Sequence, residues 1–236
     1  MIFWCSYCQR FMREEAPFED LSVSHALCDS CSSSLEDIDE RVEKGARVRD
    51  FLEATMADLF ERRLPSEDRL LAESRALGIR DVDLLVGLLQ PVLCEVGRRF
   101  VSGRISVELE HKISALTESI LQALDDAAAS EPSQPCMLLV SAPGNTHTIG
   151  PRIYAAQEAE KGEDCDIMLA AAPEQVLARL ESGGYRRLGI SVALPSQCEA
   201  ARNLADLARE RQPDIEVVIG GYAVKTATAS PAAAEA

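Results

Sequence analysis

Two cysteine pairs near the start of the chain have the spacing of metal ligands. Cys5 and Cys8 are separated by two residues, Cys28 and Cys31 likewise, and nineteen residues lie between the pairs. Two such knuckles are typical of a tetrahedral, four-thiolate zinc site. Free thiols or a redox pair are the alternatives, and His25 could replace or orient a ligand. Because four protein ligands leave zinc no open position, we expect a scaffold or partner-docking role rather than catalysis.

A histidine in the second half of the chain is another candidate for chemistry. His147 is one of only three histidines and lies in the stretch SAPGNTHTIG, residues 141–150, directly after a short apolar run. Imidazole can act as a base or as a metal ligand, so its position at the end of an expected strand is notable. A solvated or helix-capping histidine is the ordinary alternative.

The elements that position His147 follow from an alternation of short apolar runs and helical segments. The expected strands are CMLLVSA, CDIMLAA, RLGISVAL and IEVVIGG. The expected helices cover 149–161, 173–182 and 195–211. This order predicts right-handed βαβ units and a parallel sheet covered on both faces. Ligands of such sheets bind beyond the carboxyl ends of the strands, where His147, Ser191 and Gly220-Gly221 fall.

A helical zone precedes the expected sheet, and the Pro/Ser segment SEPSQP separates the two. After a charged connecting helix, helical spacing of apolar residues predicts four helices at about 46–63, 66–78, 81–102 and 106–129. Pro91 predicts a kink in the third helix, because its ring meets the carbonyl of Gly87. In the fourth helix His111 lies opposite the apolar stripe, so it is expected to face water or a polar group.

Composition and charge exclude several classes of function. The 236 residues are 47% hydrophobic and 27% charged, with a net charge of -15. Without a basic stripe, direct contact with nucleic acid is not expected. No apolar run approaches the roughly 20 residues that span a bilayer, and no secretory signal is visible, so we expect a cytoplasmic protein away from membranes. Neither a nucleophile elbow nor a glycine-rich phosphate loop is found, so an enzyme is not expected.

Residues from about 50 to 224 resemble the cobalamin-binding module, in which a four-helix cap precedes a flavodoxin-like domain. The Asp-x-His-x-x-Gly motif of that family is similar to residues 145–150, with Asn145 in place of the aspartate. The family's Ser-x-Leu element resembles residues 191–193, and its Gly-Gly pair resembles Gly220-Gly221. In the cap, the stretch RRFVSGRISVELEH is similar to the Trp, Gly and Glu-His pattern of light-sensing regulators, with Phe100 replacing Trp.

This resemblance implies roles for individual residues. His147 would coordinate the cobalt of a corrin from the lower face while Asn145 positions the imidazole ring. The residues expected to line the loop, meet the nucleotide tail or let the backbone approach the ligand are Thr146, Thr148, Gly150, Ser191, Gly220 and Gly221. The residues expected over the upper face are Phe100, Glu110 and His111.

The chain is therefore expected to be an α/β protein in which a helical-bundle cap precedes a flavodoxin-like parallel sheet. The expected parts are a zinc-knuckle-like segment at 1–33, the cap at 46–130, the cobalamin-binding domain at 135–225 and a disordered tail at 226–236. The charged segment 35–49 is a candidate homodimer contact or a solvated linker helix. The short sequence after Gly-Gly and the neutral Asn145 leave haem, which has no nucleotide tail, as the alternative to cobalamin.

The layout is similar to that of the AerR/PpaA-type photosynthesis regulators and of the related haem-binding SCHIC domains. It implies a cobalamin-binding photoreceptor or ligand-responsive antirepressor that regulates transcription through a repressor partner. Three alternatives stay open: a corrinoid carrier between methyltransferases, a haem sensor with His147 or His111 on the iron, and a pure interaction protein.

Overall fold

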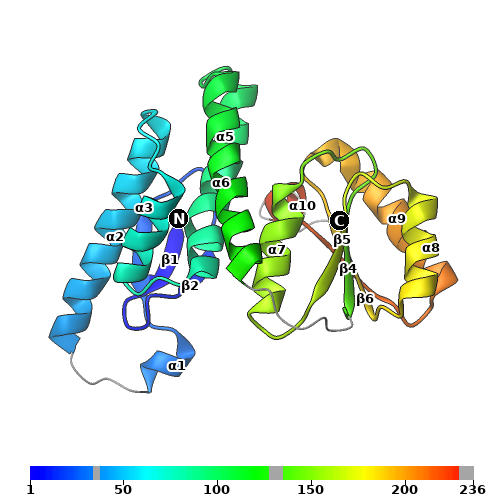
Figure 1. The fold of residues 1–236 in the computed structure, drawn as a ribbon, viewed down its shortest axis with the longest axis horizontal. Coiled ribbons are helices and arrows are strands. Elements are labelled where there is room, and N and C mark those ends of the chain that lie inside the picture. Colours follow the sequence, from blue (N-terminus) through cyan, green and yellow to red (C-terminus); the bar gives the residue numbers. More distant parts are fainter. Residues whose placement is uncertain (34–37, 128–134, 229–236) are drawn as a thin grey trace. The chain divides into compact units, whose positions relative to one another are not determined.

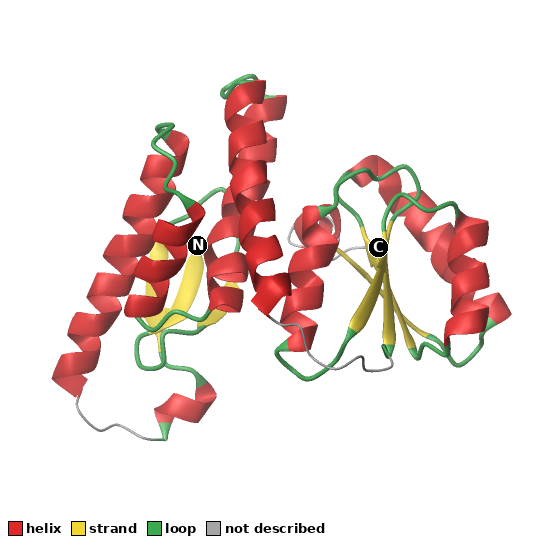
Figure 2. Ribbon diagram, viewed as in Figure 1, coloured by secondary structure: helices red, strands yellow, loops and turns green. Residues whose placement is uncertain are grey.

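The chain divides into two compact units, Met1–Ala129 and Ser130–Ala236. The structure is a computed structural model that describes residues 1–33, 38–127 and 135–228 (Figures 1 and 2). The boundary coincides with the segment SEPSQP, which the sequence predicts as a linker and which lies outside the described residues up to position 134. The helix-rich zone and the strand-rich zone of the sequence thus correspond to separate units.

The second unit is a four-stranded parallel sheet covered by helices. Its strands are β4 (Met137–Ser141), β5 (Cys165–Met168), β6 (Arg187–Ser191) and β7 (Glu216–Gly220), in the order β5-β4-β6-β7. Its helices are α7 (Ile149–Ala159), α8 (Pro173–Gly183), α9 (Cys198–Arg211) and α10 (Tyr222–Thr228). Helix α7 lies on one face, and α8 and α9 lie on the other (Figure 1). The predicted flavodoxin-like fold is confirmed.

The predicted start of the disordered tail at 226 is wrong, because residues 226–228 are helical. Helix α10 reaches Thr228, three residues into the predicted tail at 226–236. Ala223 in this helix is buried in the core of the unit, which explains why the helix forms. Positions 229–236 lie outside the described residues.

An ion-pair network stabilises the amino-terminal edge of this sheet. Glu158 of α7 is 1% exposed and accepts hydrogen bonds from Arg187 at 2.7 Å and from Lys161 at 2.6 Å. Arg187 also pairs with Glu163. Burial alone would raise the pKa of Glu158, but the hydrogen bonds and charges of Lys161 and Arg187 outweigh it and hold that pKa below its usual value.

We expect the second unit to lose stability in acid because of Glu158. A carboxyl whose pKa is lower in the folded than in the unfolded state stabilises fully above the unfolded pKa, and its contribution is lost as pH falls through the folded pKa. The free energy of unfolding should therefore fall below about pH 4.5, the usual value for this carboxyl. Glu158→Gln should be less stable at pH 7 by about 2 kcal/mol but less sensitive to acid. Urea denaturation between pH 3 and 7 measures both, and an unchanged acid slope in the variant would contradict this assignment.

The first unit combines a small sheet with a helical bundle. Its strands are β1 (Ile2–Cys5), β2 (Phe11–Glu14) and β3 (Val23–Ala26), and β1 pairs with β2 antiparallel and with β3 parallel. Its helices are α1 (Asp29–Ser32), α2 (Ile38–Phe60), α3 (Glu67–Ala76), α4 (Asp81–Leu84), α5 (Gln90–Val101) and α6 (Val107–Ala127). The sequence did not predict this sheet.

The four helices predicted for the cap correspond to α2, α3, α4 with α5, and α6. Helix α2 also contains most of the charged segment 35–49, the predicted connecting helix and candidate dimer contact, and positions 35–37 of that segment lie outside the described residues. The predicted apolar stripe of α6 is buried at Leu109, Ile113, Leu116 and Ile120, and the side chain of His111 opposite it is 72% exposed, as predicted. Phe100, near the end of α5, is 42% exposed.

A π-helical turn, Leu85–Leu89, joins α4 to α5 where the sequence predicts a kink at Gly87 and Pro91. A proline ring clashes with the carbonyl four residues back in a regular α-helix. A wider turn moves that carbonyl, so Pro91 is accommodated without breaking the helix. Pro91 accordingly lies at the start of α5 and is buried.

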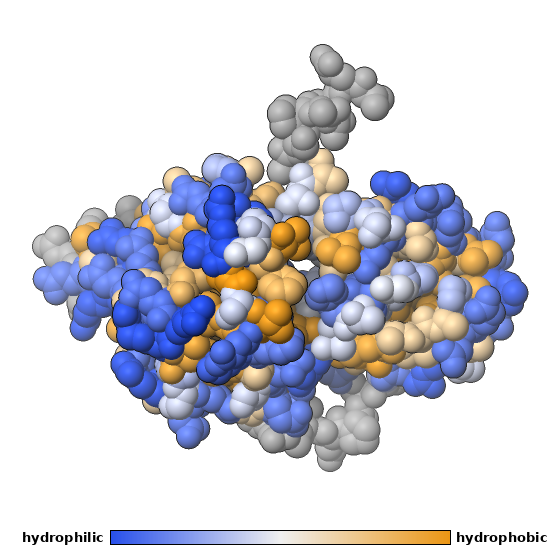
Figure 3. All heavy atoms as spheres, turned by 90° about the horizontal axis from the view of Figure 1, so that it is seen from above, coloured by the Kyte–Doolittle hydropathy of each residue, from blue (hydrophilic) through white to orange (hydrophobic). Residues whose placement is uncertain are grey.

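The face seen in Figure 3 carries both polar and apolar side chains. The content of charged residues, 27%, is ordinary for a globular protein. Across the described parts of the chain, no helix is both long and apolar enough to pass through a bilayer.

Candidate functional site

The residues predicted to bind a ligand in the second unit gather at the carboxyl edge of its sheet. Ser141, Ser191 and Gly220 end three adjacent strands and stand in register with one another. The loop with His147 follows β4, from which later strands are placed on either side. Such a switch in direction is where open α/β sheets bind their ligands.

Asn145 holds His147 through its side-chain amide. Its side chain is 1% exposed, and its Nδ2 donates a hydrogen bond to the Ser191 carbonyl oxygen at 3.0 Å. Its Oδ1 accepts the backbone N–H of His147 at 3.0 Å and lies 2.9 Å from the ring Nδ1 of the same residue. The amide therefore links the His147 loop to the end of β6.

These contacts fix the tautomer of His147. The Ser191 carbonyl can only accept, so the NH2 of Asn145 must face it and Oδ1 must face the histidine. Since Oδ1 can only accept as well, the ring Nδ1 of His147 must carry the proton. The lone pair of a neutral imidazole then lies on Nε2, for which the described residues offer no hydrogen-bond partner. A histidine in this state is ready to bind a metal.

The other predicted residues of this loop play smaller parts in the structure. Thr146 is exposed, Thr148 precedes α7, and Gly150 lies in the first turn of that helix with room for a side chain. Ser191 has its carbonyl occupied by Asn145 and by the backbone N–H of Ala142. Their expected contacts with a ligand stay predictions.

The fold requires glycine at position 221 but not at position 220. A Cβ on Gly221 would lie 2.4 Å from the carbonyl oxygen of Val192, and its φ is +110°, so only glycine fits. A Cβ on Gly220 would meet nothing within 4 Å. The protein itself therefore does not require glycine at position 220, which leaves open space at the edge of the sheet where a ligand is expected.

Sequence reasoning missed two residues at this edge. Gln197 accepts hydrogen bonds from the backbone N–H groups of Ala193 and Leu194 through Oε1, and its Nε2 donates to the carbonyl of Gly144 at 3.3 Å. It thus connects the loop after β6 to the turn before His147. The hydroxyl of Ser141 is buried without a hydrogen-bond partner in the described residues. The position of Ser141 at the end of β4 was the only sequence signal for either residue.

The predicted upper-face residues lie in the first unit. Phe100 is near the end of α5, and Glu110 and His111 are neighbours in α6. Glu110 accepts a hydrogen bond from Ser114 at 2.9 Å, and its second oxygen lies 3.4 Å from Nε2 of His111. Their predicted role over a bound ligand stays a prediction.

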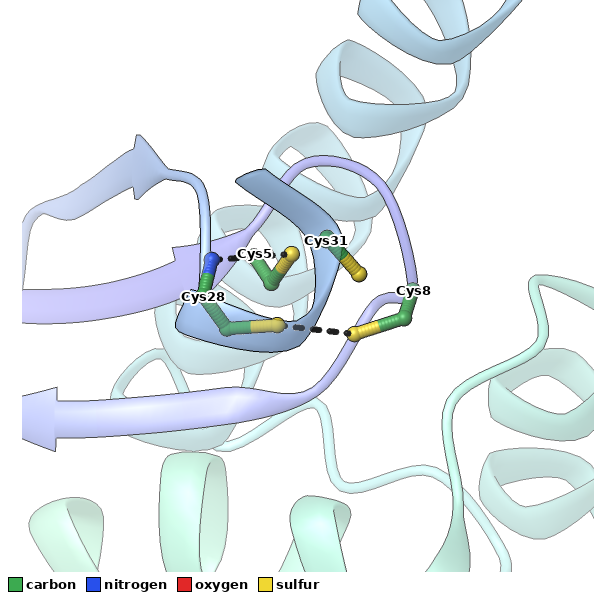
Figure 4. Close-up of side chains that lie close together, drawn as sticks. All are labelled: Cys5, Cys8, Cys28 and Cys31. Carbon is green, nitrogen blue, oxygen red and sulfur yellow. Dashed lines mark hydrogen bonds between the residues drawn. The ribbon is translucent and has the colours of Figure 1, made fainter. Parts of the chain in front are cut away.

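The four predicted zinc ligands do come together (Figure 4). The sulfur atoms of Cys5, Cys8, Cys28 and Cys31 all lie within 4.8 Å of one another, and those of Cys8 and Cys28 are 3.8 Å apart. A zinc ion with Zn–S distances of about 2.3 Å places its sulfurs about 3.8 Å apart in a tetrahedron. His25 is not in the cluster and lies against Gly45 of α2 instead, so it does not replace a cysteine.

The thiols of this cluster have very different acidities. A hydrogen bond with Ser30 lowers the pKa of Cys28 to about 6, whereas burial raises the pKa of Cys8 to about 12. Without a cation, the thiolates would repel one another at these distances. A bound metal ion is what would allow them all to be deprotonated together.

Each of the two units matches a known protein family. Residues 135–234 match a family described as B12 binding domain, and residues 46–125 match a second family with the same description. The structure is similar to the monomethylamine corrinoid protein of Methanosarcina barkeri, with 16% identity, a TM-score of 0.60 and coverage of 79% of this chain and 88% of that one. This similarity establishes a common fold.

Two other solved structures resemble the chain more weakly. One is a cobalamin-binding protein from Desulfitobacterium hafniense DCB-2, with 18% identity, a TM-score of 0.36 and coverage of 72% and 83% of the two chains. The other is the methanol:cobalamin methyltransferase complex of Methanosarcina barkeri, with 19% identity, a TM-score of 0.37 and coverage of 84% and 82%. No curated protein sequence matches the chain.

Proposed function

Because the chain carries a cobalamin-binding module, with a helical B12-binding domain followed by a flavodoxin-like one, we propose that it is a cobalamin-responsive regulatory protein. The observation that carries this proposal is the state of His147, whose Nδ1 is held by Asn145 and whose Nε2 is left with the lone pair. A bound cobalamin would supply a cobalt centre whose ligands change on illumination or by exchange. Nε2 of His147 would hold that centre.

The residues of the second unit fit such a ligand. Nε2 of His147 is an available nitrogen donor, and space is open beside Gly220. Ser141 contributes a buried hydroxyl that has no partner within the described part of the protein. A buried polar atom without a partner costs free energy, and a nearby ligand or water is a common reason for one.

Asn145 favours a sensor over a carrier of methyl groups. A carboxylate beside the histidine could take up a proton and so change how it holds the imidazole ring. The Asn145 amide cannot be protonated in this way, and its NH2 is already committed to Ser191. Its geometry instead suits a histidine that stays on the metal.

Regulation would act through a protein partner, as the sequence predicts. The net charge of -15 disfavours direct contact with nucleic acid. A transcriptional repressor remains the proposed partner, and the protein itself is proposed not to be an enzyme.

A corrinoid carrier is the second candidate function. The fold is shared with the monomethylamine corrinoid protein of Methanosarcina barkeri. A haem sensor is the third, since an unprotonated imidazole nitrogen also binds haem iron.

Reconstitution of the purified protein with cobalamin or haem distinguishes the three candidate functions. We expect the purified full chain to bind one hydroxocobalamin, methylcobalamin or adenosylcobalamin, with an absorption spectrum changed from that of the free cofactor, and not to bind haem at equal concentration. Illumination of the protein loaded with adenosylcobalamin should change its amide hydrogen exchange beyond the His147 loop. Binding of haem alone would favour the third candidate. Cobalamin binding without any response to light or to upper-ligand exchange would favour the carrier.

A further inference from the structure

We propose that Cys5, Cys8, Cys28 and Cys31 bind one zinc ion whose role is to fasten the amino-terminal sheet onto the helices of the first unit. The site would then be an internal support of the helical unit, and not an appendage for docking partners. This inference does not depend on the proposed cobalamin function.

The backbone around the cysteines is already arranged as two knuckles. In the first, the N–H of Gln9 donates to the carbonyl of Cys5 at 3.0 Å, and Gln9 has a φ of +59°. In the second, the N–H of Cys31 donates to the carbonyl of Cys28 at 3.0 Å, and the N–H of Cys28 donates to Sγ of Cys5 at 3.5 Å. A left-handed conformation is uncommon for a residue other than glycine and is kept only where surrounding contacts require it.

Strand β1, which ends at Cys5, packs directly against the π-helical turn Leu85–Leu89. Trp4, the residue before Cys5, is fully buried. A Cβ on Gly87 would lie 2.4 Å from Cζ2 of Trp4 and 2.8 Å from Cδ2 of Phe11. Only glycine therefore allows the sheet and this helix to approach so closely. The apolar contact begins one residue away from a zinc ligand.

Polar contacts tie the same sheet to two helical segments. The backbone N–H of Phe11 donates to Asp83 at 3.2 Å, and Asp83 is 3% exposed and paired with Arg80. At the opposite edge of the sheet, the N–H of Val23 in β3 donates to Glu53 of α2 at 3.4 Å. The sheet thus contacts both α2 and the segment from α4 to α5.

The sheet is too small to hold this arrangement without help. Its fully or largely buried apolar residues other than cysteine are Ile2, Trp4 and Val23. Three such side chains cannot offset the conformational entropy of ordering some thirty residues. A closed four-thiolate zinc site stabilises segments of this size, because the free energy of metal binding adds to that of folding.

Loss of zinc should therefore release Trp4 from the π-helical turn. Trp4 is the only tryptophan of the chain, so its fluorescence reports this contact alone. We expect the full-length, corrinoid-free protein to contain one zinc per chain by elemental analysis. A strong chelator should shift the Trp4 emission to the red and raise amide exchange at 85–89 at least tenfold. Exchange in β4 to β7 should stay unchanged, and added zinc should reverse both effects.

Matched variants test the ligands. Cys31→Ser should lose zinc and show the red-shifted emission without chelator, whereas Cys198→Ser, a half-buried cysteine in the second unit, should keep both. If Cys31→Ser is insoluble, chelation and zinc return in the unaltered chain decide the question. Iron in place of zinc, no metal in protein purified under reducing conditions, or zinc whose removal leaves Trp4 emission unchanged would each overturn the proposal.

Discussion

Replacing His147 with alanine should weaken cobalamin binding by at least tenfold and remove a protein nitrogen from the cobalt. His147 presents Nε2 because Asn145 holds Nδ1, and alanine offers no donor at this position. Changing only a group that orients a metal ligand costs about 10–100-fold in affinity, so loss of the ligand should cost no less. Titration followed by absorption measures the affinity. Electron paramagnetic resonance of the cobalt(II) protein, grown with ¹⁵N-histidine, shows directly whether a histidine nitrogen is bound.

The other exposed histidine provides the control. His111→Ala removes an imidazole that is 72% exposed and whose Nε2 lies 3.4 Å from Glu110. We expect the ¹⁵N splitting from histidine to persist in this variant. If His111→Ala abolishes the splitting and His147→Ala preserves it, the ligand assignment is wrong. If both preserve it, the third histidine or a different binding mode must be considered.

The contacts of Asn145 also explain why this chain has asparagine where the related motif has aspartate. An aspartate at position 145 could accept from His147 but could not donate to the Ser191 carbonyl unless it were protonated. Asparagine satisfies both neighbours with no charge to bury. The structure therefore gives the replacement a local reason, which the sequence motif alone did not supply.

The sheet unit was predicted well because its signals are local. Five consecutive buried residues form β4, and Pro173 and Pro195 mark the helical segments after β5 and β6, so the sequence pattern alone places these elements. The grouping of His147, Ser191 and Gly220 at one edge follows from parallel topology. The orientation of the Asn145 amide does not, because it depends on a carbonyl 46 residues away.

The amino-terminal sheet was missed because its stability comes from distant residues. Strands of four residues carry little pattern of their own, and β1 is buried by contacts with helices that follow much later in the chain. The contact of Trp4 and Phe11 with Gly87 joins positions about 80 residues apart. The cysteine spacing could be recognised from sequence because metal ligands recur at fixed intervals, but the surface on which the knuckles rest could not.

Gly221→Ala should destabilise the second unit by about 3 kcal/mol or more. A Cβ there would lie 2.4 Å from the carbonyl oxygen of Val192 and 2.9 Å from its nitrogen, which are backbone atoms that cannot rotate away. Val192 is also held by a hydrogen bond from its N–H to the carbonyl of Gly220 at 2.8 Å. The backbone strain of a φ of +110° in a residue other than glycine adds about 1–3 kcal/mol to the steric cost. Chemical denaturation of the corrinoid-free protein measures the loss.

Gly220→Ala separates the fold from the ligand. A Cβ at this position meets no atom within 4 Å, so the free energy of unfolding should change by less than about 1 kcal/mol. If the open space beside Gly220 is where cobalamin lies, the same variant should bind cobalamin more weakly, because the new methyl group occupies that space. Gly221 would then be required for the packing of the backbone, and Gly220 for the binding of the ligand. Equal loss of stability in both variants, or unchanged cobalamin affinity in Gly220→Ala, would contradict this division.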